Sequence, residues 1–233
     1  MSDLGALSLG NIVLLESLQP AERDAYARLC RWRRYAQNEQ IIDSQSDSRD
    51  VFFVVKGMVR VVNYSLSGRE VTLDNIGAGG YFGQLAAIDG SPRSANVMAC
   101  EETVTAAMPP DHFSRLVSQH PTIGLAVMRE LARLLRQSTD RIMDLSTLGA
   151  NNRVHAELLR LARSDAGDGR RATISPIPSH SEIASRVSTT RETVARALGD
   201  LARGGIVKRE KDALVILDLH QLEDMVQNVR GDA

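Results

Sequence analysis

Cysteine is scarce in this chain of 233 residues, which contains only Cys30 and Cys100. Two cysteines far apart in sequence cannot build the dense disulfide framework of a small secreted domain. They also lack the close spacing of zinc ligands, and an iron–sulfur cluster needs about four cysteines. The sequence therefore predicts no metal site and a reducing compartment.

Long apolar runs and an excess of charge are absent too. No stretch approaches the ~20 apolar residues that span a bilayer. The N-terminal segment MSDLGALSL carries Asp3 and lacks the basic residues that begin a signal peptide. The formal net charge is −1, so any surface for nucleic acid must be local. We expect a soluble, cytoplasmic protein with no membrane partner.

The motifs of common catalytic centres are also missing. The sequence contains no Gly-x-Ser-x-Gly elbow, no Walker phosphate loop and no His-Glu-x-x-His zinc motif. We therefore expect a protein that is not an enzyme.

Short β-like segments fill residues 40–108. The stretch VFFVVKGMVRVVNYSLSGREVTLDNI separates β-branched and aromatic runs by Lys-Gly and Ser-Gly turns, which is typical of short antiparallel strands. Such close spacing predicts a barrel, sandwich or roll. Ahead of this region, AERDAYARLCRWRRY predicts a helix whose solvated end carries Arg31, Arg33 and Arg34.

The period becomes helical between residues 122 and 148. Apolar positions spaced three and four residues apart form a heptad seam with the charged residues outside it. The seam consists of Met128, Leu131, Leu135, Ser138, Ile142 and Leu145. It predicts a dimer contact between two parallel helices or packing against the helix's own domain. Both can hold, because Val127 and Leu134 lie beside the seam.

One seam position, Ser138, is polar, and Thr139 follows it. A polar residue in a coiled-coil seam lowers stability and can fix register. The pair therefore either sets the register or meets a ligand. Gly149-Ala150-Asn151 then breaks the helix and predicts a hinge between two domains.

Two short helices and a hairpin are predicted in the last third. Ser179 or Ser181 is the expected N-cap of the first helix. Ser188-Thr189-Thr190 predicts the break before a second helix that ends at Gly204-Gly205, and IVKREKDALVIL predicts the hairpin. This succession describes a winged helix-turn-helix.

The second of these helices exposes side chains suited to DNA. Arg191 and Arg196 match the acceptors of guanine, and Glu192 can accept from cytosine N4. An acidic residue between two arginines favours base readout over mere phosphate affinity. The pattern predicts a reader of double-stranded DNA, and a plain helical hairpin with solvated charges is the alternative.

The segment RETVARAL, with Arg191, Glu192 and Arg196, resembles the recognition helix of the bacterial cyclic AMP receptor protein family. The resemblance implies that these three residues read a TGTGA-like half-site of a palindrome. It also implies phosphate contacts from Ser179 and His180. The order of parts in the family is similar as well: a β-roll, a phosphate-binding cassette, a long dimer helix and a winged helix.

The cassette of this family has the form Phe/Leu-Gly-Glu-Leu, a short loop, then Arg-x-Ala. The matching residues here are Gly83, Gln84, Leu85 and Ala86, followed by Arg93, Ser94 and Ala95. A turn of helix there directs free N–H groups at an anion, and the arginine offers a planar fork for phosphate oxygens. The resemblance implies that these residues bind the phosphate of cyclic AMP or cyclic GMP. It implies that Ser138 and Thr139 reach the purine from both subunits.

Gln84 departs from the family, whose nucleotide binders have glutamate there to accept from the ribose 2′-hydroxyl. Glutamine accepts without the help of a charge. This predicts lower affinity, a preference for a different cyclic nucleotide, or another small anion as ligand. An internal ion pair of Arg93 with a carboxylate such as Asp89, in a pocket no longer used, is the alternative.

The expected fold is α+β. An antiparallel β-roll of the cyclic-nucleotide-binding jelly-roll type is expected in residues 1–121, a dimerisation helix and hinge in 122–149, and a winged helix-turn-helix in 150–233. The expected function is an allosteric, cyclic-nucleotide-responsive transcription regulator that acts as a homodimer and contacts RNA polymerase. The alternatives keep the DNA function and change the input to haem, a gas, another small anion or no ligand.

Overall fold

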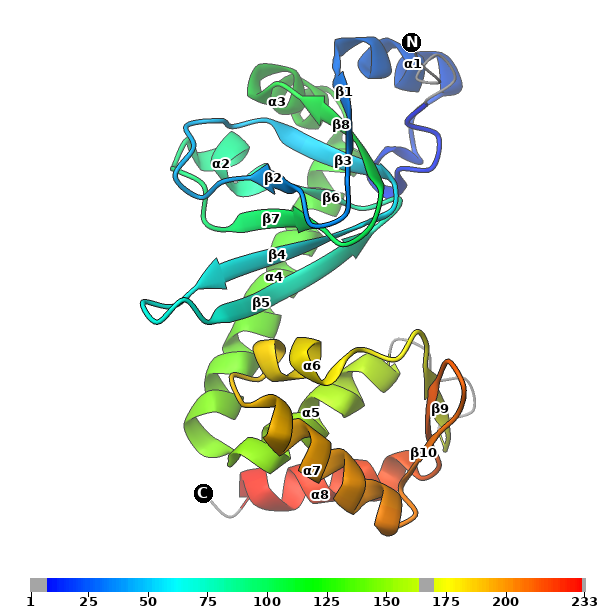
Figure 1. Cartoon of the computed structure of the whole chain (residues 1–233). Helices are drawn as coiled ribbons and strands as arrows, with labels where there is room; N and C mark the ends of the chain where they lie inside the picture. The colour runs from blue at the N-terminus through cyan, green and yellow to red at the C-terminus, as the bar shows by residue number, and fades with distance from the viewer. Residues whose placement is uncertain (1–7, 164–169, 232–233) are drawn as a thin grey trace. The chain divides into compact units, whose positions relative to one another are not determined.

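The computed structural model describes residues 8–163 and 170–231. The chain forms two compact units, Met1–Leu134 and Leu135–Ala233 (Figure 1). The division falls inside the long helix α4 (Pro121–Thr147). Part of the loop predicted after residue 163 lies outside the described residues.

The first unit is built on two four-stranded antiparallel sheets. One sheet has the strand order β1-β8-β3-β6 and the other β2-β7-β4-β5. The strands are β1 (Arg31–Tyr35), β2 (Gln40–Ile42), β3 (Val51–Lys56), β4 (Met58–Tyr64), β5 (Glu70–Gly77), β6 (Tyr81–Phe82), β7 (Asn96–Ala99) and β8 (Thr103–Met108). The short helix α2 (Gln84–Asp89) stands between β6 and β7. The predicted antiparallel β-roll is confirmed.

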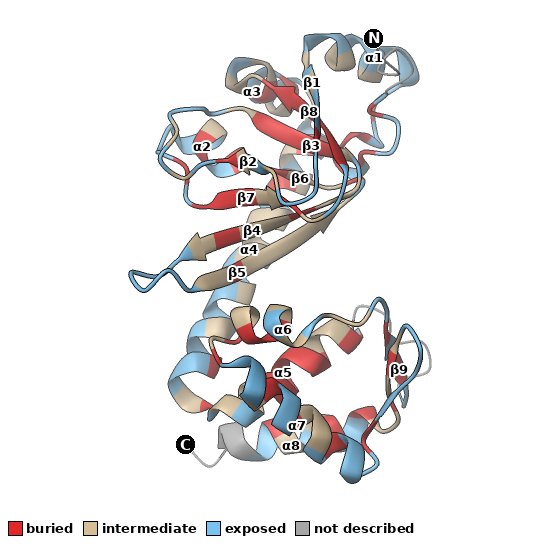
Figure 2. Ribbon diagram, viewed as in Figure 1, coloured by how far each residue is buried: buried red, intermediate tan, exposed pale blue. Residues whose placement is uncertain are grey.

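Strand β3 separates two hydrophobic clusters. Phe52 and Val54 belong to a cluster with residues of β4, β6 and β7. Val51 and Phe53 belong to a second cluster with the turn η1 (Val13–Leu15), helix α3 (Pro110–Gln119) and the start of α4. Because β3 is covered on both faces, its sequence is a continuous apolar run, and Figure 2 shows it buried.

The basic cluster of the N-terminal region lies on a strand and not at the end of a helix, so this prediction was wrong. Helix α1 (Pro20–Leu29) ends at Cys30, whose backbone is extended. Arg31, Arg33 and Arg34 then pair with β8 as edge strand β1. They are solvated, as predicted, and form ion pairs with Asp50, Glu39 and Glu102, respectively. The gain from pairing with β8 explains why the helical pattern does not continue.

The second unit begins with the C-terminal part of α4 and continues with a helical domain that carries a small sheet. Its helices are α5 (Ala150–Arg163), α6 (His180–Arg186), α7 (Arg191–Arg203) and α8 (Leu219–Gly231). Strands β9 (Ala172–Ile174), β10 (Val207–Arg209) and β11 (Leu214–Ile216) form an antiparallel sheet of order β10-β11-β9. The winged helix-turn-helix is confirmed, and α8 is an addition that was not predicted.

Helix α5 lies at the centre of the second unit. Val154, Leu158 and Ala162 are fully buried in its core, together with residues of α6, α7, α8 and the sheet. Figure 2 shows α5 largely buried, whereas α7 has an exposed face. The three-residue break before α7 and its end at Gly204 agree with the prediction.

Candidate functional site

The cassette begins where strand β6 turns into helix α2. Gly83 caps this helix with a φ of +83°, in the left-handed region. A Cβ atom at this position would lie 2.8 Å from Arg93 Nη1 and 2.8 Å from the carbonyl oxygen of Asp50. Only glycine tolerates both the conformation and the close approach. Gly83 therefore brings the backbone directly against the arginine.

Arg93 is buried, with only 6% of the residue exposed. Its Nη1 donates to the carbonyl of Gly83 (2.9 Å), and its Nη2 donates to the carbonyl of Asp50 (2.8 Å). Nε and Nη2 also donate to Ser48 Oγ at 3.3 and 3.2 Å. The guanidinium lies 5.8 Å from the ring centroid of Phe52, which stacks on Phe82.

The partners of Arg93 are neutral. Among the described residues it forms no ion pair, and the carboxylate of Asp50 pairs with Arg31 instead. Asp89 accepts a hydrogen bond from the backbone N–H of Ser91 (2.9 Å), which lowers the pKa of its carboxyl. The alternative ion pair between Arg93 and Asp89 is therefore not formed. Burial lowers the pKa of Arg93, and the negative charge of Asp50 opposes this shift.

The first residues of α2 complete the cassette. Gln84 is 7% exposed, yet its side-chain amide makes no hydrogen bond to any residue that the structure describes. Ala86 is buried and Leu85 is exposed. The N–H groups at the start of a helix have no intrahelical partner. This end of α2 thus combines backbone N–H groups with the side-chain amide of a largely buried glutamine.

Ser94 and Ala95 connect the arginine to strand β7. Ser94 is exposed, and its carbonyl accepts from Asn63 Nδ2 at 3.1 Å, whereas Ala95 is buried. Asn63 lies on β4, so this contact fixes the segment against the neighbouring strand. The structure brings Gly83, Gln84 and Arg93 into one site, with Ser94 and Ala95 following in the chain.

Ser138 and Thr139 lie on the part of α4 that belongs to the second unit. Both residues are exposed, and Thr139 Oγ1 donates to the carbonyl of Leu135 at 3.0 Å. The cassette belongs to the first unit. The predicted contact of Ser138 and Thr139 with a ligand therefore stays a prediction.

Helix α6 starts with a capping box. Ser179 Oγ accepts from the N–H of Glu182 (3.2 Å), and Glu182 Oε2 accepts from the N–H of Ser179 (2.6 Å). Ser179, one of the two predicted N-caps, is therefore the N-cap. His180 is the first residue of the helix and is partly exposed. Both residues stand at the end of α6 where a phosphate is stabilised.

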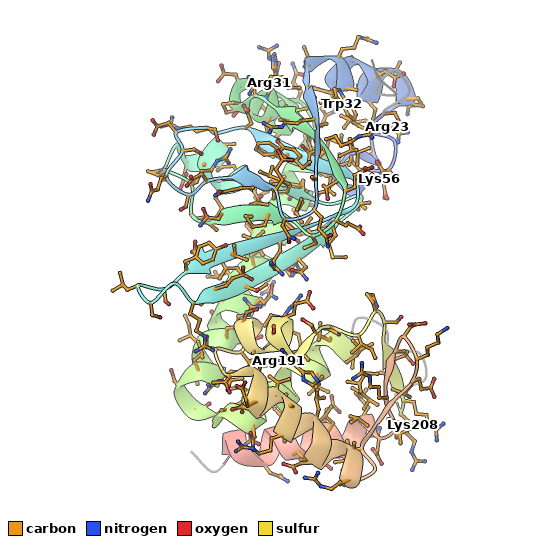
Figure 3. All side chains as sticks on the ribbon, in the orientation of Figure 1. Arg23, Arg31, Trp32, Lys56, Arg191 and Lys208 are labelled. Atoms are coloured by element: carbon orange, nitrogen blue, oxygen red, sulfur yellow. The ribbon has the colours of Figure 1, made fainter. Side chains whose placement is uncertain are left out.

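Helix α7 has one buried and one exposed face. Val194, Ala197 and Leu201 are buried in the core of the second unit. The side chains of Arg191, Glu192 and Arg196 are exposed, and Figure 3 labels Arg191 at the start of the helix. Hydrogen bonds from its own N–H and from Thr190 lower the pKa of Glu192, as does the charge of Arg191. Glu192 is therefore an ionised acceptor beside a cation.

Some residues of the arginine site were not identified from the sequence. Ser48 and Asp50 hold Arg93 through a hydroxyl and a main-chain carbonyl, and neither group leaves a recognisable sequence pattern. Phe52 lies in an apolar strand, where its contact with a cation cannot be told from ordinary packing. None of the helices in the described residues, α4 included, is both long and apolar enough to cross a bilayer.

The chain matches two known domain families. Residues 32–120 match the cyclic nucleotide-binding domain, and residues 152–225 match the Crp-like helix-turn-helix domain. The cyclic AMP receptor protein of Thermus thermophilus is 30% identical over 212 residues, which are 91% of this chain and 95% of that protein. A CRP-like cAMP-activated global transcriptional regulator of Mycobacterium tuberculosis is 30% identical over 173 residues, covering 74% of this chain and 77% of that protein.

Solved structures give the same result. The catabolite activator protein of Thermus thermophilus is 30% identical, with a TM-score of 0.52, and the alignment covers 93% of this chain and 99% of that one. A CooA mutant from Carboxydothermus hydrogenoformans is 25% identical, with a TM-score of 0.78 and coverage of 91% and 94%. Both similarities extend over the two units of the chain.

Proposed function

The chain belongs to the cyclic AMP receptor protein family of transcription regulators, and from this premise we propose that a cyclic purine mononucleotide, cyclic AMP or cyclic GMP, controls its binding to DNA. The family supplies the general function, which is regulation of transcription without enzymatic activity. Family membership does not establish the effector, the DNA site or the homodimer of this chain, and these three features are what we propose.

The observation that carries the proposal is the environment of Arg93. A buried guanidinium is costly unless it is paired, and here its partners are the carbonyls of Gly83 and Asp50 and the hydroxyl of Ser48. Among the described residues no carboxylate forms an ion pair with Arg93, and the charge of Asp50, which pairs with Arg31, acts on it only from a distance. The start of α2, with its N–H groups and the side chain of Gln84, directly follows Gly83, whose carbonyl accepts from Arg93. A cyclic phosphate with its ribose fits this set of donors and acceptors.

Gln84 sets the affinity and the preference for the nucleotide. Its amide oxygen can accept from the ribose 2′-hydroxyl, but without the added strength of a charge. Its amide nitrogen is a donor where a carboxylate has none. We expect weaker binding of the ribose than with glutamate at this position, or a ligand with another acceptor at the same place.

The homodimer is proposed from the exposed stripe on α4. Met128, Leu135, Ile142 and Leu145 are 60%, 70%, 63% and 50% exposed. These are four of the predicted seam positions, whereas Leu131 packs partly against the core of the first unit. A row of large apolar side chains at heptad spacing is covered when a second copy of the same helix packs against it.

The DNA site is proposed to be a palindrome with TGTGA-like half-sites. Arg191, Glu192 and Arg196 would read base edges from the exposed face of α7, while Ser179 and His180 contact phosphates. In a two-fold dimer the recognition helices meet successive major grooves about 34 Å apart. RNA polymerase is the further protein partner in this proposal.

The mechanism is a shift between two arrangements of the dimer. The ligand changes the equilibrium only by its difference in affinity for the two states. Ser138 and Thr139 are proposed to contact the purine in one arrangement, so that the register of α4 follows the ligand. The two winged domains then take the spacing that the palindrome demands.

Calorimetric titration of the nucleotide-stripped protein with cyclic AMP and cyclic GMP, in parallel, tests the effector. We expect micromolar binding of one nucleotide, lost in Arg93→Ala and kept in Arg33→Ala, a change to an exposed arginine of the same unit. No heat with either nucleotide, in a protein that still binds DNA, would reject the cyclic nucleotide. Haem absorbance and co-purified small molecules would then be examined.

A further inference from the structure

Helix α5 carries two polar residues on one face within the core of the second unit. Arg153 and Glu157 are four positions apart and therefore project from the same side of the helix. Glu157 is completely buried, and Arg153 is largely covered. Charged side chains in a protein core are rare unless they are paired. The partners of Arg153 and Glu157 therefore indicate what these two side chains do in the fold.

Arg153 connects the end of α4 to the turn that precedes α7. Its Nη1 donates to the carbonyl of Leu148, directly after α4, at 2.9 Å. Its Nε donates to the carbonyl of Val187 (2.9 Å), and its Nη2 donates to the carbonyl of Ser188 (3.2 Å). One planar guanidinium thus holds three main-chain oxygens from two separate segments.

The turn that Arg153 holds has an unusual backbone. Ser188 has a φ of +51°, although it is not a glycine. The left-handed conformation is unfavourable for a residue with a Cβ atom. The turn is short, and Thr190 already caps the recognition helix α7. The hydrogen bond to the Ser188 carbonyl therefore supports the residue whose conformation sets the direction in which α7 leaves the turn.

Glu157 makes a second connection between the same segments. Its Oε1 accepts from Arg186 Nη1, in the last turn of α6, at 3.2 Å. Its Oε2 accepts from Arg160 Nη1, and Arg160 Nη2 donates to Asp144 Oδ2 on α4 at 3.1 Å. Asp144 is also buried. Two carboxylates and two guanidiniums alternate along these links.

We propose that Arg153 and Glu157 are positioning residues for DNA recognition, which tie the turn between α6 and α7 to the end of α4. Neither residue is expected to touch DNA. They fix the angle at which the exposed face of α7 is presented, and they make that angle follow the end of the dimerisation helix. The inference rests on the proposed DNA-binding function of α7.

A positioning residue and a merely stabilising residue affect different properties of the protein. Buried ion pairs add little net stability, because desolvation offsets their attraction, but they restrict the geometries that the core can adopt. Base readout depends on that geometry, since a bidentate contact requires a defined position of the side chain. Nonspecific binding to phosphates depends mainly on charge. Loss of positioning should therefore lower sequence discrimination more than general affinity.

The test starts from a binding site that the wild-type protein selects from random-sequence DNA, so that no assumption about the site enters. Discrimination is the ratio of affinities for this site and for scrambled DNA. We expect Arg153→Met to lower it at least tenfold, with affinity for scrambled DNA changed less than twofold. Arg28→Met, which alters an exposed arginine of α1, should leave the ratio unchanged. Adding Ser188→Gly to Arg153→Met should restore part of the ratio, because glycine adopts a positive φ without strain.

A second variant covers the event that Arg153→Met does not fold. Glu157→Leu combined with Arg186→Leu removes one acid and one base, and leaves Asp144 paired with Arg160. We expect an unchanged or raised melting temperature with at least a tenfold loss of discrimination. A folded variant with wild-type discrimination would overturn the positioning role alone. If the wild-type protein selects no sequence at all, the DNA-binding function falls, and this inference falls with it.

Discussion

Two different settings hold arginines in this molecule, one around the buried Arg93 and one around the partly buried Arg160 and Arg186. In the first unit, Arg93 is held by neutral oxygens and forms no ion pair with the described residues. In the second unit, Arg160 and Arg186 face the carboxylates of Asp144 and Glu157. A neutralised arginine completes a structure, whereas a buried arginine without a counter-charge is suited to a ligand that brings one. Neutral partners alone do not mark a binding cation, because Arg153 is also held by main-chain carbonyls. Arg93 differs from Arg153 in that it adjoins the start of helix α2 and its backbone N–H groups.

The largest effect is expected where the charge balance of the second unit is broken. Glu157→Gln leaves two guanidiniums with one carboxylate in a buried place, which should lower the free energy of unfolding by about 3 to 5 kcal/mol. Urea unfolding followed by far-ultraviolet circular dichroism measures the change. Trp32, the single tryptophan, reports on the first unit and serves as an internal control. A loss below about 1 kcal/mol would show that the ion pairs do not balance one another.

Exposed arginines form a third class, which should affect specificity and not stability. Arg191→Ala should relax the preference at one base pair of the half-site by about 1 to 3 kcal/mol. Glu192→Ala should do the same at another base pair. Lys208→Ala, on the hairpin, is the comparison variant and should at most weaken binding uniformly. Competition titrations with single-base variants of the DNA measure this, and uniform weakening by Arg191→Ala would assign that residue to phosphates.

Replacing Arg93 with lysine sharpens the comparison within the first unit. Lysine keeps the charge but loses the planar fork that spans Gly83, Asp50 and an anion. Nucleotide affinity should fall about tenfold, or about 1.4 kcal/mol, while the Trp32 unfolding transition stays close to that of the wild type. Affinity equal to that of the wild type would mean that charge alone holds the ligand.

His155 is a buried ionisable group of the second unit. It is covered by the core, and its Nδ1 has no hydrogen-bond partner among the described residues. Burial lowers its pKa below the ordinary 6.5, and the charge of Asp200 opposes the shift. The unfolded state therefore binds the proton more readily than the folded state does. The contribution of His155 to stability is present above pH 6.5 and is lost as the pH falls.

Below pH 6.5, the titration of His155 should change the free energy of unfolding by at most about 1.4 kcal/mol per pH unit. His155→Leu should flatten the profile between pH 7 and pH 5. Equal slopes in His155→Leu and the wild type would assign the pH dependence to other groups.

The smallest effect is expected at Gln84. Gln84→Glu restores a charged acceptor for the ribose hydroxyl, which should tighten binding of cyclic AMP by about 1 kcal/mol, or roughly fivefold. Calorimetry with cyclic AMP measures the change, and 2′-deoxy cyclic AMP is the control ligand, because it lacks the hydroxyl. An identical gain for both ligands would contradict a contact with the ribose.

Much of the fold followed from local patterns. Alternating strands, the heptad seam of α4, the cap at Ser179 and the break before α7 all depend on residues close in sequence. The wrong prediction for Arg31–Tyr35 and the omission of α8 concern elements that depend on partners distant in sequence. Pairing with β8 decides the conformation of β1, and nothing near Arg31 in the sequence indicates that partner.

The candidate sites divide in the same way. Gly83, Gln84 and Arg93 were found because a compact motif contains them, and Arg191, Glu192 and Arg196 because they share one helix face. The three oxygens around Arg93 and the links of Arg153 join positions up to 45 residues apart. Main-chain carbonyls are present at every residue, so the sequence cannot show which of them an arginine will select.

The links from α5 also determine how this protein can be recombined with others. Gly149 is the obvious place to join a foreign sensor to the DNA-binding domain, because the long helix ends just before it. A junction there separates Asp144 and Leu148 from Arg160 and Arg153, their hydrogen-bond partners on α5. A junction before Asp144 keeps both links within the transplanted module. Chimeric regulators made at the earlier junction should retain the wild-type site preference under any input that moves the helix.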